Sequence, residues 1–136
     1  MANKKIEEIE GIGPATGDKL RAAGVNDTDG LLEQGRTRSG RKALAEQSGL
    51  SEKQILGFVN MADLFRIKGV GAEFAELLEC AGVDTVKELA TRNAANLTEK
   101  LEEVNAEKKL VRRVPTVAQV EDWVRQASEL PPKVEH

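Results

Sequence analysis

The sequence predicts an all-α protein, on the strength of three observations. The chain has 136 residues, of which 40% are hydrophobic, and this is enough to form a core. Its apolar residues are mainly Leu, Ala, Val and Ile, whereas aromatic residues make up 3% and Tyr is absent, so the composition favours helices over sheets. A helical pattern punctuated by glycines also recurs along the chain.

The recurring pattern is an internal repeat. Ile9 aligns with Ile67 and Gly11 with Gly69, and the same offset of 58 residues holds as far as Val25. The later part of each copy aligns with a larger offset, because Ser51 matches Thr116. The sequence therefore predicts a first copy at residues 1–66 and a second at 67–136, with an insertion near residues 105–115 of the second copy.

Helix boundaries are predicted by glycines and by capping residues. Gly24 and Gly82 follow short amphipathic runs, so we expect each to end a helix in the left-handed conformation. Three pairs have the spacing of capping boxes and predict helix starts: Ser51 with Gln54, Thr85 with Glu88, and Thr116 with Gln119.

The apolar spacing after Ser51 predicts a helix that continues to Phe65 or Arg66 and connects the two copies. Pro131 and Pro132 predict the end of the last helix and a loose C-terminal tail.

The most specific motif is Gly-apolar-Gly between two helices. In the first copy Gly11 and Gly13 permit a tight reversal, and the central Ile12 is expected to fill the space between the helices. Gly17 lies four residues after the second glycine, where a helix normally disfavours glycine. We interpret Gly17 as a point of close approach between two helices, an interpretation that its alignment with Ala75 supports.

This motif resembles the helix-hairpin-helix family, and two copies in register resemble bacterial proteins with a duplicated helix-hairpin-helix. The pattern Leu-x-x-Ala-Gly-Val, followed by Thr and Leu, is similar to small SAM-like helical domains such as the recombinase N-terminal domain and the C-terminal domain of the RNA polymerase alpha subunit. The resemblance implies two tandem helix-hairpin-helix units of about five helices each, sharing a continuous connecting helix.

The resemblance also implies contact with the DNA backbone that does not depend on base sequence. The electrostatics of a helix N-terminus is consistent with such contact, because the amides of a glycine turn at this end form an anion site. The expected DNA-binding residues are the turn of the first hairpin and nearby side chains, namely Gly11, Ile12, Gly13, Ala15, Thr16, Lys19, Arg36, Arg38, Arg41 and Lys42. Arg38-Ser39-Gly40-Arg41 is expected to be a turn that leads into a helix.

The second hairpin, Gly69, Val70 and Gly71, is expected to bind more weakly. Three carboxylates, of Glu73, Glu76 and Glu79, follow it on a helix that would face phosphate. A basic cluster in the predicted insertion, Lys108, Lys109, Arg112 and Arg113, favours DNA again, although charge clusters are often only solvated surface.

No catalytic constellation, cofactor motif or small-molecule site is recognisable, so we expect a binding protein rather than an enzyme. Cys80 is predicted to be a small buried apolar residue, and Phe58 and Trp123 are predicted to pack in the core. The absence of a signal segment and of an apolar span favours a cytoplasmic protein that does not bind membranes. The net charge of −3 leaves two hypotheses: a DNA-binding module, or an adaptor on the same scaffold that has lost DNA binding and contacts a protein partner.

Overall fold

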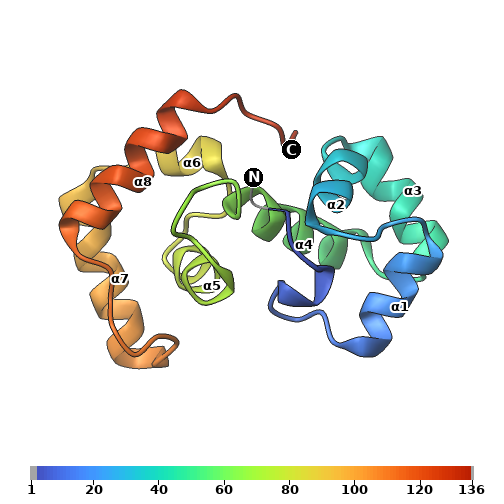
Figure 1. The fold of residues 1–136 in the computed structure, drawn as a ribbon, viewed down its shortest axis with the longest axis horizontal. Coiled ribbons are helices and arrows are strands. Elements are labelled where there is room, and N and C mark those ends of the chain that lie inside the picture. Colours follow the sequence, from blue (N-terminus) through green and yellow to red (C-terminus); the bar gives the residue numbers. More distant parts are fainter. Residues whose placement is uncertain (1–2, 136) are drawn as a thin grey trace. The chain divides into compact units, whose positions relative to one another are not determined.

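The computed structural model describes residues 3–135, and within them the protein is all-α, as the composition predicts (Figure 1). The described residues form one short 3-10 helix, eight α-helices and no strand, apart from an isolated bridge between Lys5 and Asp27. The elements are η1 (Ile6–Glu8), α1 (Pro14–Ala22), α2 (Thr28–Gly35), α3 (Arg38–Ser48), α4 (Glu52–Leu64), α5 (Ala72–Cys80), α6 (Val86–Ala90), α7 (Ala94–Lys108) and α8 (Val117–Glu129).

The described chain divides into two compact units. The first contains the residues up to Asp63 together with those from Lys133 onward, and the second is Leu64–Pro132. Both predicted repeat ranges include terminal residues, 1, 2 and 136, that lie outside the described part. The sequence predicts that the connecting helix α4 ends at Phe65 or Arg66. In the structure it ends at Leu64, and a turn follows it. Apolar spacing could not locate this end, because the turn residues Phe65 and Ile67 are buried as well.

The first unit packs α3 against α1 and α2. Gly35, at the end of α2, lies directly against α4, since a Cβ at this position would overlap the Val59 side chain. The core is formed by fully buried aliphatic side chains from every helix of the unit: Ile6, Ile9, Leu20, Val25, Leu31, Leu44, Ile55 and Val59.

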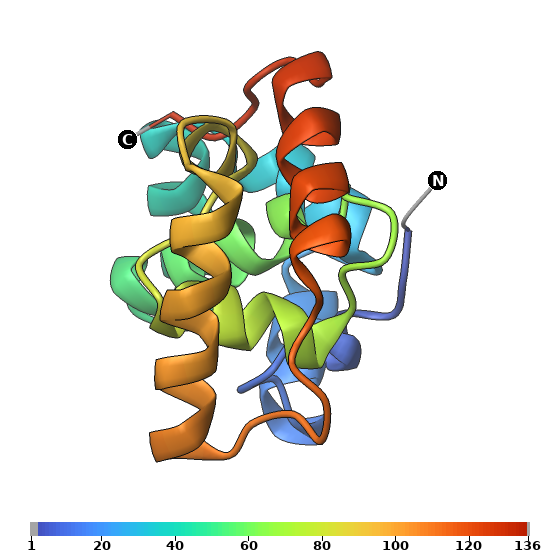
Figure 2. The same ribbon diagram turned by 90° about the vertical axis from the view of Figure 1, so that its left-hand side faces the viewer.

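The second unit packs α8 against α6 and α7, and α5 against α7. Figure 2 shows α7 and α8 side by side. Its core is likewise mainly aliphatic, with two large aromatic side chains, and it contains Phe65, Ala75, Leu77, Leu78, Val83, Val86, Leu89, Leu101, Val120 and Trp123.

The predicted helix boundaries are largely confirmed by backbone geometry. Gly24 and Gly82 have φ of +93° and +92°, in the left-handed region where glycine is favoured. The capping boxes of Ser51 with Gln54 and of Thr116 with Gln119 are both formed, with each side chain bonded to the other residue's N–H. At α6 only half of the predicted box forms: the Thr85 hydroxyl accepts from the Glu88 N–H, and the Glu88 carboxylate bonds to Arg92 instead.

The C-terminal segment differs from the loose tail that the two prolines predict. Within the first unit the Glu135 N–H donates to the Arg36 carbonyl at 2.7 Å, and Lys133 pairs with Glu33 at 3.1 Å. Between them, the Val134 side chain is only 8% exposed. The prolines do end α8, but an apolar side chain two residues later gives the extended segment a reason to dock.

None of the helices in the described range is both long enough and apolar enough to span a membrane.

Candidate phosphate-binding surfaces

The two glycine hairpins have the same backbone geometry. Gly11 and Gly69 have φ of +95° and +96°, so the first glycine of each hairpin occupies a conformation that side chains disfavour. The central residues Ile12 and Val70 are 5% and 4% exposed, and they fill the space between helices as predicted. Only the main chain of these two residues is therefore available to a ligand.

An aromatic ring packs against the first glycine of each hairpin. A Cβ on Gly11 would lie 3.3 Å from the Phe58 ring, and one on Gly69 would lie 3.1 Å from Trp123 Nε1. The prediction that Trp123 is a core residue is confirmed, since it is 3% exposed; Phe58 is half-buried. Each hairpin is thus supported from beneath by an aromatic side chain and presents its main chain outward.

The helices that follow the hairpins begin without a side-chain cap. At α1 the N-cap is Gly13 with Pro14 next, and at α5 it is Gly71; neither N-terminus receives a side-chain hydrogen bond. Every other α-helix of the described chain has such a bond, made by Asp27, Thr37, Ser51, Thr85, Asn93 or Thr116. The first-turn amides of α1 and α5 are consequently open to an external acceptor.

An acidic side chain lies against the helix that follows the first hairpin. Glu7, on η1, is hydrogen-bonded to Arg21, and this bond holds the pKa of the Glu7 carboxyl below its usual range. The same carboxylate covers Gly17, where a Cβ would lie 2.6 Å from Glu7 Oε2. Gly17 therefore makes room for a side chain of η1, whereas the prediction was a close approach of two helices. Lys19 is exposed, and Thr16 is half-buried.

The four basic residues predicted to bind DNA around the start of α3, Arg36, Arg38, Arg41 and Lys42, do not all lie on the protein surface. Arg41 is 5% exposed and donates hydrogen bonds to the Gly35 and Glu135 carbonyls, so its predicted contact with phosphate is incompatible with this structure. Arg36 is 4.0 Å from Glu33, while Arg38 and Lys42 are exposed.

The predicted turn at Arg38-Ser39-Gly40-Arg41 is the first turn of α3, capped by Thr37. Both views show the α2–α3 junction at one end of the first unit and the start of α1 at the other (Figures 1 and 2).

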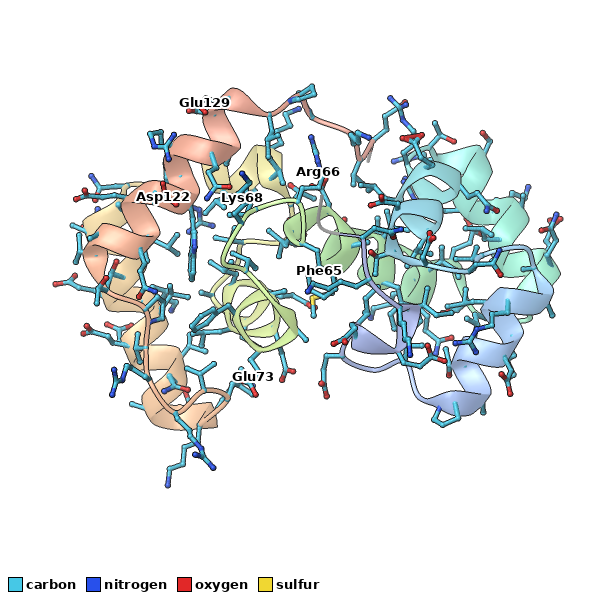
Figure 3. The ribbon with its side chains drawn as sticks, in the orientation of Figure 1. Phe65, Arg66, Lys68, Glu73, Asp122 and Glu129 are labelled. Carbon is cyan, nitrogen blue, oxygen red and sulfur yellow. The ribbon has the colours of Figure 1, made fainter. Side chains whose placement is uncertain are left out.

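The second hairpin carries a cation that the sequence analysis overlooked. Lys68 precedes Gly69, at the position where the first hairpin has Glu10, and its side chain is exposed. Its main chain is held by the Gln126 side chain, which accepts from the Lys68 N–H at 2.8 Å and donates to its carbonyl at 3.1 Å. Figure 3 shows Lys68 beside α8, the helix that carries Asp122. Comparison of the residues before the two hairpins would have revealed this difference in charge.

The predicted insertion brings three of its four basic residues, all except Lys108, to the start of α5. Together they line a pocket of about 730 Å³ whose walls are Glu73, Phe74, Lys109, Leu110, Val111, Arg112 and Arg113. Glu73 extends from the end of α5 that lies toward the end of α7 (Figure 3). Three cations and one carboxylate meet there, at one of the two uncapped helix starts.

These pocket cations are not used by the fold. Of the arginine side chains in the described chain, those of Arg38, Arg112 and Arg113 make no hydrogen bond or ion pair. Lys109 also has no acidic partner there. Exposed cations without partners remain available to an anion from outside the chain.

Other chemistry finds little support among the described residues. No group of three or more metal-ligating side chains occurs in them. Cys80 is exposed, which corrects its predicted burial, and partial desolvation raises the pKa of its thiol. A raised thiol pKa makes the reactive thiolate scarcer at neutral pH.

A family model described as a domain of unknown function (DUF4332) matches residues 10–130. The chain belongs to this family. The match spans both hairpins and both units, so the repeated geometry lies within the family domain. No curated protein and no solved structure matches the chain.

Proposed function

We propose that this protein is two tandem helix-hairpin-helix units that act as a non-enzymatic binding module. The proposal is supported by pairs of equivalent positions with the same geometry: Gly11 with Gly69, and Gly24 with Gly82. It is supported further by the two uncapped helices, α1 and α5, which each follow a Gly-apolar-Gly turn.

The ligand that this surface fits best is the phosphate backbone of a nucleic acid. One observation carries the proposal: unpaired cations of the predicted insertion and the uncapped start of α5 line one pocket. Open amides at a helix N-terminus stabilise an anion, and arginine donates paired hydrogen bonds to phosphate oxygens.

The proposal places the stronger phosphate binding at the second hairpin, whereas the sequence led us to expect it at the first. The first hairpin is preceded by acidic Glu7, Glu8 and Glu10, whereas the second is preceded by Lys68 and flanked by the basic loop. Glu73 opposes phosphate at the second site, but three cations of the same pocket outnumber it. The whole chain carries a charge of −3, so binding depends on this local surface.

A reciprocal charge swap tests the proposal. Fluorescence anisotropy of a labelled oligonucleotide, titrated with the full chain at low ionic strength, should show binding that weakens steeply as salt is added. Lys68→Glu copies the first hairpin's charge onto the second and should weaken binding. Glu10→Lys makes the opposite change and should leave affinity unchanged or raise it.

If neither single-stranded nor duplex DNA binds at low ionic strength, the proposal is wrong. The adaptor hypothesis then takes its place. It predicts a stoichiometric protein partner whose recovery resists nuclease treatment.

A further inference from the structure

We infer that the pocket beside α5 holds an unstacked nucleotide, so that the ligand of the second unit is single-stranded nucleic acid rather than a duplex. This inference rests on the proposed function and specifies its substrate class. The juxtaposition behind it is a cationic rim, formed by Lys109, Arg112 and Arg113, around an apolar floor, formed by Phe74 and Leu110 with Val111.

The shape of the site suits a single strand better than a duplex. A duplex presents a convex ridge of phosphates, and its bases are stacked inside, so a duplex contacts cations on an open surface. The site is instead a half-open hollow of about 730 Å³, in the size range of ligand pockets. A single-stranded segment can turn one base into such a pocket while its phosphates stay at the rim.

The floor of the pocket contains an aromatic ring, that of Phe74. Phe74 is half-buried and packs on Trp123, with ring centroids 5.2 Å apart and planes tilted by 54°. The Trp123 ring therefore holds Phe74 in place, and Phe74 also forms part of the pocket wall. A fixed aromatic ring in a basic site is a surface on which any base can stack.

The loop that carries the three cations is held to the end of α7 by two hydrogen bonds. Asn105, near the end of α7, donates from Nδ2 to the Val111 carbonyl at 3.0 Å and accepts from the Val111 N–H at 2.9 Å. Lys109 lies between Asn105 and Val111 in the sequence. Its φ is +53°, and it is the one residue other than glycine with positive φ in the described chain. The bonds hold the main chain of the loop in this conformation, so the loop itself needs no ordering when a ligand arrives.

Binding of a labelled twenty-nucleotide oligothymidine and of a matched duplex to the full chain tests the inference. The single strand should bind about tenfold or more tightly than the duplex at the same salt. Arg112→Ala/Arg113→Ala should weaken single-strand binding roughly tenfold or more, because two charge-assisted contacts are lost. The matched control Lys87→Ala/Lys100→Ala removes the same charge from exposed lysines outside the pocket and should change affinity little.

A second variant separates stacking from charge. Phe74→Leu keeps an apolar side chain but removes the aromatic face, and it should lower single-strand affinity about fivefold while leaving duplex affinity unchanged. Thermal melting monitored by circular dichroism checks that each variant is folded.

The outcomes distinguish the inference from the proposed function. Equal or tighter duplex binding overturns the inference and leaves phosphate binding by the pocket cations intact. A single-strand affinity unaffected by both pocket variants overturns the inference and also the assignment of the phosphate site to this pocket. Failure of both oligonucleotides to bind overturns the inference and the proposed function together.

Discussion

Replacing Gly69 by alanine should destabilise the second unit more than the same replacement at Gly82. Both glycines have strongly positive φ, of +96° and +92°, so alanine at either position carries the left-handed penalty of about 1–2 kcal/mol. At Gly82 the nearest atom to a new Cβ is Arg92 Nη2, the end of a half-buried side chain, and its distance of 3.4 Å is an ordinary contact that requires no shift. At Gly69 it is Trp123 Nε1 at 3.1 Å, in a packed ring that has no room to move.

We therefore expect Gly69→Ala to cost about 1 kcal/mol more than Gly82→Ala, the lower end of the range for overpacking. The difference is measured by urea unfolding followed by fluorescence of Trp123, the single tryptophan of the chain, which lies in the second unit. With a urea dependence of about 1–3 kcal/mol per molar, Gly69→Ala should unfold at roughly 0.3–1 M less urea than Gly82→Ala. Equal midpoints for the two variants would refute the role given to the tryptophan contact. A wild-type midpoint for both would refute the backbone argument as well.

Three further predictions follow from side-chain contacts. Asn105→Ala removes both hydrogen bonds to Val111 and should lower the unfolding free energy of the second unit by about 1–3 kcal/mol. Hydrogen exchange at the Val111 amide should accelerate. Unchanged protection of this amide would contradict the role given to the two Asn105 bonds. Arg41→Ala should destabilise the first unit, seen as a lower melting temperature by circular dichroism, yet leave the salt dependence of oligonucleotide binding unchanged, because this guanidinium bonds to carbonyls. The Arg21 hydrogen bond lowers the pKa of the Glu7 carboxyl, so the stability it contributes is present above the ordinary glutamate pKa and is lost as pH falls through the lowered one. Carboxyl NMR titration should give this lowered pKa, and Glu7→Gln should remove the corresponding part of the acid sensitivity; an unshifted pKa would contradict the assignment.

Local backbone features could be read from the sequence because they depend on neighbouring residues. The positive φ of Gly24 and the capping box of Ser51 with Gln54 each involve one turn of chain, and both were predicted correctly. The burial of Ile12 and Val70 followed from the repeat, since these equivalent apolar positions share one environment.

Contacts between distant residues could not be read in this way. One acceptor of Arg41 is the Glu135 carbonyl, 94 residues away, and nothing in a basic cluster indicates a bond to main chain. Likewise, Gly17 was expected to mark a close approach of two helices, but what it accommodates is the Glu7 carboxylate. Charge patterns show which residues are ionised, whereas partners and burial are properties of the folded chain.

The salt dependence of single-strand binding tests the central claim most directly. Binding constants for oligothymidine are measured over a range of salt concentrations with the wild-type chain and with Arg112→Ala/Arg113→Ala. If these arginines neutralise phosphates, the slope of log affinity against log salt should become shallower by about 0.7 for each lost contact, or about 1.4 in total. An unchanged slope, with binding otherwise intact, would show that the nucleic acid lies elsewhere on the protein.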